Sequence, residues 1–118
     1  MIIKSENIIK DKSFEFALKI IDLYKYLRYE KKEYVISKQL LRSGTSIGAN
    51  VEEAQAAQSK KDFISKMSIA AKEARETHYW LRLLKHGEFI IKDDLLEDCD
   101  ELIKLLTSIV KTASENNS

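Results

Sequence analysis

The sequence lacks proline altogether and contains only three glycines among its 118 residues. β-Sandwiches and small β-barrels need many tight turns, and proline and glycine form a large share of them. Their scarcity therefore argues against an all-β fold. A length of 118 residues fits one domain, which we expect to span residues 1–118.

Cysteine and long apolar runs are also scarce. The single cysteine, Cys99, has no partner for an internal disulfide, which argues against a secreted disulfide scaffold. No apolar run approaches the ~20 residues that a membrane-spanning helix requires. The first residues, up to Ser13, are too charged for a secretory signal peptide. We therefore expect a cytoplasmic protein that has no membrane partner.

An excess of one charge is the third thing missing. The chain has 20 basic and 19 acidic residues, which gives a net charge of +1. A nearly neutral chain has no bulk attraction for nucleic acid or for anionic membranes. Any affinity for RNA must then come from local clusters of basic residues.

Helical periodicity is what the sequence does contain. Apolar residues recur every three or four positions over residues 13–30, 37–57, 60–86 and 94–114. Asp11 or Ser13 is placed to begin the first helix, Ser59 to begin the third and Gly87 to end it. Short connections join the four segments, so the prediction is an all-α fold, an antiparallel up-down four-helix bundle.

Two glycines interrupt the second predicted helix. Gly44 and Gly48 each cost roughly 1 kcal/mol against alanine in a helix interior. Close approach of a neighbouring helix offsets that cost, because glycine leaves no side chain in the way. A hinge is the alternative interpretation.

Residues for catalysis are hard to find. The only histidines, His78 and His86, do not follow a glutamate by three positions, as in di-iron bundles. Cys99 falls on an apolar stripe, where cysteine behaves as a small hydrophobic residue. The segment Gly44–Gly48 lacks the Gly-Lys-Ser/Thr ending of a phosphate loop. We predict no enzymatic activity, no metal, no cofactor and no small-molecule substrate.

Polar residues border the apolar stripes of the second and third predicted helices. The set comprises Arg42, Ser46, Asn50, Glu53, Glu73 and Glu76. Carboxylates between apolar residues must be paired, because an unpaired buried charge is costly. The candidate partners are Arg42, Arg75 and Arg82. We interpret the set as a structural network that fixes helix register. A site for a ligand or a partner protein is the alternative.

Apolar residues also form second seams beside the main stripes of the first and third predicted helices. They are Phe14, Ala17, Ile21, Ile69, Trp80 and Leu83. One small core cannot face them all, and exposed apolar patches usually mark interfaces. The seams predict self-association into a homo-oligomer.

Lysines gather near the predicted connections and are the candidates for nucleic-acid contacts: Lys31, Lys32, Lys38, Lys60 and Lys61. In an antiparallel bundle the first three lie at one end and the last two at the other. Arg28, Tyr29 and Tyr34 add side chains that stack on bases near the first end. Solvated loop lysines are the commoner interpretation.

Two long motifs suggest a family. The segments Leu41–Ala54 (LRSGTSIGANVEEA) and Asp62–Leu81 (DFISKMSIAAKEARETHYWL), with Phe14–Ala17 before them, resemble the 23S rRNA intervening sequence proteins. The resemblance covers roughly residues 13–110. It implies an antiparallel four-helix bundle, commonly a homopentamer, with no enzymatic activity.

Some members of that family are encoded within insertions in bacterial ribosomal RNA genes. Related bundles serve diversity-generating retroelements as accessory proteins, for which a basic pentamer is expected to contact RNA. The six polar residues from Arg42 to Glu76 match the family pattern, where their role is architectural. This chain differs from the accessory type in being nearly neutral. The resemblance implies a self-associating scaffold, with an RNA-associated ring as the alternative.

Overall fold

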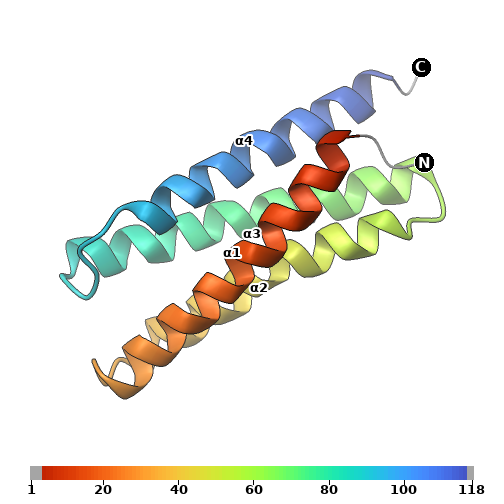
Figure 1. The fold of residues 1–118 in the computed structure, drawn as a ribbon. Coiled ribbons are helices and arrows are strands. Elements are labelled where there is room, and N and C mark those ends of the chain that lie inside the picture. Colours follow the sequence, from red (N-terminus) through yellow and green to blue (C-terminus); the bar gives the residue numbers. More distant parts are fainter. Residues whose placement is uncertain (1–3, 117–118) are drawn as a thin grey trace.

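Four helices make up the computed structural model, which describes residues 4–116 (Figure 1). They are α1 (Lys4–Tyr29), α2 (Ile36–Gln55), α3 (Lys60–His86) and α4 (Asp94–Glu115). Each helix packs on the next in the chain, and α4 packs back on α1. The helices run alternately up and down, so the predicted all-α four-helix bundle is confirmed. The start of α1 and the end of α4 lie at the same end of the bundle as the α2–α3 connection.

The first helix begins well before the predicted Ser13. Ile9 is fully buried, and it extends the stripe of Phe16 and Ile20 toward the N-terminus at helical spacing. Ser13 lies inside the helix, where its hydroxyl donates a hydrogen bond to the carbonyl oxygen of Lys10 at 3.2 Å. The prediction of a cap at Asp11 or Ser13 was wrong, because burial of Ile9 outweighs the weak local signal of a capping residue.

Glu33 starts the second helix from outside it. Its carboxylate accepts hydrogen bonds from the backbone N–H groups of Val35, Ile36 and Ser37 at 3.2, 3.1 and 2.7 Å. These donors have no partner within the helix, so a carboxylate there satisfies them and favours the positive end of the helix dipole. The helix spans Ile36–Gln55, slightly shorter than the predicted 37–57 at its C-terminal end.

The third helix has the predicted bounds, and the fourth differs only at its last residue. Ser59 caps α3 by accepting a hydrogen bond from the N–H of Asp62 at 3.0 Å. At the other end Gly87 has an ordinary φ of −81°, and Glu88 takes the left-handed conformation with φ 66°. The N–H of Phe89 then bonds the carbonyl of Leu84 at 2.9 Å, which closes a Schellman-type ending.

The core is mostly aliphatic, includes Phe16 and Met67, and takes residues from all four helices. Gly44 lies against Ile20 so closely that a methyl group at Gly44 would be 2.9 Å from the Ile20 side chain. This confirms the close approach of a neighbouring helix. Ser43 of α2 and Thr77 of α3 are fully buried, and their hydroxyl groups hydrogen-bond at 2.9 Å. The pairing removes the cost of burying two hydroxyls.

Candidate functional site

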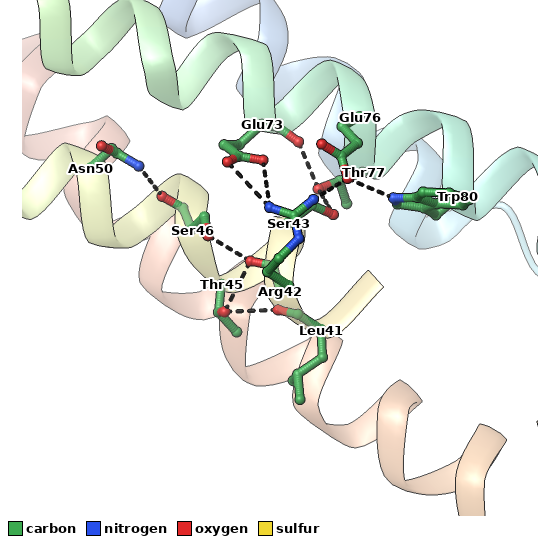
Figure 2. Close-up of polar contacts among 10 residues, drawn as sticks. All are labelled: Leu41, Arg42, Ser43, Thr45, Ser46, Asn50, Glu73, Glu76, Thr77 and Trp80. Atoms are coloured by element: carbon green, nitrogen blue, oxygen red, sulfur yellow. Dashed lines mark hydrogen bonds and ion pairs between the residues drawn. The ribbon is translucent and has the colours of Figure 1, made fainter. Parts of the chain in front are cut away.

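A charged cluster bridges α2 and α3 on the outside of the bundle (Figure 2). Arg42 of α2 reaches across to two carboxylates of α3. Its Nη1 lies 3.4 Å from both carboxylate oxygens of Glu73, and its Nη2 donates to Oε2 of Glu76. The indole N–H of Trp80 donates to the same Oε2 at 3.0 Å. Two donors from different helices thus converge on one carboxylate oxygen.

These contacts favour the ionised forms of the cluster. The hydrogen bond from Trp80, together with the guanidinium of Arg42, holds the pKa of Glu76 below its ordinary value, although partial burial opposes this. The same Glu76 raises the pKa of Arg42. Half of the Arg42 side chain is exposed, against 18% for Glu73 and 33% for Glu76. The cluster therefore lies at the boundary between core and surface.

The structure brings together Arg42, Glu73 and Glu76 from the six predicted network residues. Ser46 instead donates within α2 to the carbonyl of Arg42 at 2.6 Å, and Asn50 donates to the carbonyl of Ser46 at 2.9 Å (Figure 2). Glu53 lies apart, with its Oε1 4.0 Å from the Nζ of Lys66. Trp80 was predicted as an interface residue only. Its position four residues after Glu76 was the sequence signal for this hydrogen bond.

The predicted interface residues divide into two kinds. Phe14 is 60% exposed, and Ile69 and Leu83 are 39% and 37% exposed. Ala17, Ile21 and Trp80 are partly buried. The prediction omitted Leu18, which is 50% exposed and lies one helical turn from Phe14. Sequence spacing alone was enough to find it.

The predicted lysines occupy opposite ends of the bundle, as the α1–α2 and α2–α3 connections do in Figure 1. Lys31, Lys32 and Lys38 surround the α1–α2 connection. Lys60 and Lys61 lie at the other end, where the Nζ of Lys60 donates to the carbonyl of Asn116 at 2.7 Å. The five lysines do not form one continuous patch.

Cys99 has the environment of a core residue. Its side chain is fully buried, and its thiol donates to the carbonyl of Ala74 at 3.2 Å. Burial raises its pKa to about 12, so the thiol is protonated at neutral pH. Among residues 7–116, whose side chains the structure describes, no three His, Cys, Asp or Glu side chains gather in a way that suits a metal ion. No helix in the same range is long and apolar enough to cross a membrane.

Comparison with known proteins decides the family. The model of the 23S rRNA-intervening sequence protein family matches residues 5–108. The chain belongs to this family. A similar solved structure is a protein of unknown function from the S23 ribosomal protein family of Bacteroides thetaiotaomicron. It is 55% identical, covers 91% of this chain and 98% of its own, and superposes with a TM-score of 0.89. A comparison with curated proteins gives no match.

The extent of the family match agrees with the observed helices. It begins at residue 5, inside the early turns of α1 that the periodicity of the sequence did not reveal. It includes the charged cluster and the exposed apolar residues of α1 and α3. This member of the 23S rRNA-intervening sequence protein family therefore carries its candidate surfaces within the matched region.

Proposed function

We propose that this protein is a non-catalytic, cytoplasmic, self-associating four-helix scaffold that assembles as a homopentameric ring. The observation that carries the proposal is a pair of exposed apolar stripes on the outside of the bundle. The α1 stripe consists of Phe14 and Leu18, and the α3 stripe consists of Ile69 and Leu83.

The two stripes flank α2 on opposite sides. Phe14 lines a shallow surface pocket with Glu52 of α2, on the α1 side. On the α3 side, Ile69, Glu76 and Leu83 are spaced by seven residues, and Glu76 holds Arg42 of α2. The charged cluster thus lies in the middle of the α3 stripe. Arginine and tryptophan beside exposed aliphatic residues are typical of protein interfaces.

Two different stripes on one chain suit a head-to-tail contact. In such a contact the α1 stripe of one copy packs on the α3 stripe of the next, and the chain of contacts closes into a ring. Covering the exposed half of a leucine or phenylalanine contributes on the order of 1 kcal/mol. Each stripe therefore adds measurably to association. The proposal of five copies in the ring rests on the resemblance to the family.

Several contacts support a non-catalytic role. Arg42 pairs with both Glu73 and Glu76 in the cluster, and the Trp80 indole donates a further hydrogen bond to Glu76. The Cys99 thiol is buried and protonated. Side chains whose polar atoms are satisfied by one another stabilise the surface and make it more rigid.

Sedimentation velocity on three single variants tests the proposal. We expect the wild-type protein to sediment as an oligomer at micromolar concentration. Leu18→Lys and Leu83→Lys each place a charge in one stripe, so each variant is expected to be monomeric. Val35→Lys is the control, because Val35 is 73% exposed and lies outside both stripes. It should assemble like the wild type.

Mixing the two stripe variants distinguishes a head-to-tail contact from a symmetric one. Leu18→Lys keeps an intact α3 stripe, and Leu83→Lys keeps an intact α1 stripe. An equimolar mixture should therefore form a heterodimer that grows no further. A monomeric wild type would overturn self-association. A mixture that stays monomeric, with an oligomeric wild type, would overturn the head-to-tail arrangement.

A further inference from the structure

The connection between α1 and α2 forms a basic, tyrosine-rich tip. We define this tip as residues 25–38, which contain five basic and two acidic residues. Tyr26, Tyr29 and Tyr34 are 43%, 61% and 47% exposed. Exposed apolar side chains that gather in one patch, rather than singly, mark interaction sites. Neither proposed stripe includes any of them.

Cations and aromatic rings are interleaved on the tip. The guanidinium carbon of Arg28 lies 5.8 Å from the ring centroid of Tyr29 and 5.3 Å from that of Tyr34. The Nζ of Lys31 lies 5.9 Å from the ring centroid of Tyr26. One of the two acids, Glu33, is occupied because its carboxylate caps α2. The tip therefore places positive charge against partly exposed aromatic rings.

An apolar groove of about 490 Å³ continues the tip toward the α3–α4 connection. Tyr26 and Lys31 belong to both the groove and the tip. Its walls include Leu23, Phe89, Ile90, Ile91 and Leu95. Its charged rim is balanced, with Lys31 and Lys92 facing Glu88 and Asp94. The volume is ample for one planar ring system with hydrogen-bonding edges.

We infer that the tip binds single-stranded nucleic acid. Bases stack on Tyr29 and Tyr34, phosphates contact Arg28, Lys31 and Lys32, and one unstacked base enters the groove beside Tyr26. Aromatic side chains alternating with cations are how proteins hold single strands without reading sequence. A duplex offers no free base face to the tyrosines, and an acidic peptide uses the cations alone. The combination on the tip therefore favours a single strand.

Fluorescence anisotropy with labelled oligonucleotides tests this inference on the full chain. The probes are a uridine oligomer of roughly 12 nucleotides, matched in length to known single-strand sites, and an RNA duplex of the same length. We expect salt-dependent binding of the single strand and weaker binding of the duplex at about 50 mM NaCl.

Paired variants separate stacking from charge. Tyr29→Ala with Tyr34→Ala should weaken binding by about 5- to 150-fold for each lost stack. Tyr29→Phe with Tyr34→Phe keeps both ring faces and should bind like the wild type. Lys31→Gln with Lys32→Gln should lower the slope of log affinity against log salt by about 1.4. Lys111→Gln is the control and should change nothing, because Lys111 is exposed near the C-terminal end of α4, at the opposite end of the bundle.

The groove is tested separately by Ile91→Asp. Ile91 is 88% exposed, so the substitution should leave the fold intact, and circular dichroism checks this. The added charge should weaken single-strand binding. If Ile91→Asp binds the single strand like the wild type, no base occupies the groove.

Three outcomes would overturn the inference. The first is no salt-dependent binding of the uridine oligomer. The second is equal binding by the alanine and phenylalanine pairs. The third is competition by polyglutamate as strong as that by the oligomer, which would indicate an acidic protein partner. None of these results depends on the oligomeric state, so failure here leaves the scaffold proposal standing.

Discussion

Gly44 sets the distance between α1 and α2 because it has no side chain. A methyl group there would lie 2.9 Å from two carbon atoms of Ile20, which is fully buried. Gly48 differs, since a methyl group there would lie 3.4 Å from the carbonyl oxygen of Ser13. The same residue type in the same helix thus has two different roles.

Substitution of the two glycines should therefore give opposite results. We expect Gly44→Ala to lower the free energy of unfolding by about 1–3 kcal/mol through overpacking. Gly48→Ala should be neutral, or raise it by up to about 1 kcal/mol through helix propensity. Urea unfolding followed by circular dichroism, at one fixed protein concentration, measures both. Equal destabilisation by the two variants would contradict the packing described here.

Glu76 should make stability depend on pH in the acid range. Its pKa is lowered in the folded protein by Trp80 and Arg42, so the ionised carboxylate stabilises the fold. This contribution is present in full above the ordinary range of a glutamate. It is lost as pH falls from about 5 downward, through the lowered pKa.

Glu76→Gln is the direct test of that pH dependence. The variant should lose less stability than the wild type between about pH 6 and pH 3, because glutamine does not titrate. Glu97→Gln is the control, since Glu97 is exposed on α4 and lies outside the cluster. Parallel curves for wild type and Glu76→Gln would show that the cluster adds nothing in solution.

The charged cluster illustrates what sequence could and could not supply at the scale of residues. Spacing placed Glu73 and Glu76 beside the apolar stripe of α3 with Arg42, Arg75 and Arg82 as candidate partners. The structure pairs them with Arg42. The sequence did not show that Ser46 and Asn50 bond within α2, because serine and asparagine satisfy themselves locally when a helix carbonyl is in reach. Only the rotation of α2 against α3 decides which residues meet.

At the scale of elements, some helix ends are determined by local capping residues and others by packing against the core. The start of α3 followed from Ser59, whose cap is local. The start of α1 did not, because Ile9 is held by the core rather than by a capping motif. The start of α2 was predicted closely, although its cap is the preceding Glu33.

The early turns of α1 should contribute strongly to stability. Ile9→Ala removes a fully buried side chain and should lower the free energy of unfolding by about 2–5 kcal/mol. Asn7→Ala, two residues earlier and exposed, should stay within about 0.5 kcal/mol of the wild type. Chemical denaturation of both variants decides the matter. A small effect of Ile9→Ala would mean that the helix effectively begins later, near Ser13.

Substitution of Glu88 by glycine at the end of α3 should stabilise the protein. This residue has φ 66°, a conformation that costs an L-residue about 1–2 kcal/mol and costs glycine little. Glu88→Gly should therefore raise the melting temperature. Glu88→Ala keeps the strain while removing the charge and is the matched control. Equal melting temperatures for the two variants would show that the strain is not significant.

At the scale of the whole molecule, the bundle followed from periodicity and short connections, because every helix has one apolar stripe to bury. The arrangement of side chains on the outer surfaces could not be predicted as readily from the sequence. Sequence placed lysines near both ends, and the structure shows how the tyrosines and Arg28 combine at one of them. The two apolar stripes are separated by α2, which a linear pattern does not reveal.

Native mass spectrometry of freshly purified protein at low salt tests the central claim most directly. The scaffold account predicts a species of five times the 13.6 kDa chain mass, which disappears in Leu18→Lys and in Leu83→Lys. A wild-type spectrum that contains only the 13.6 kDa monomer would contradict it.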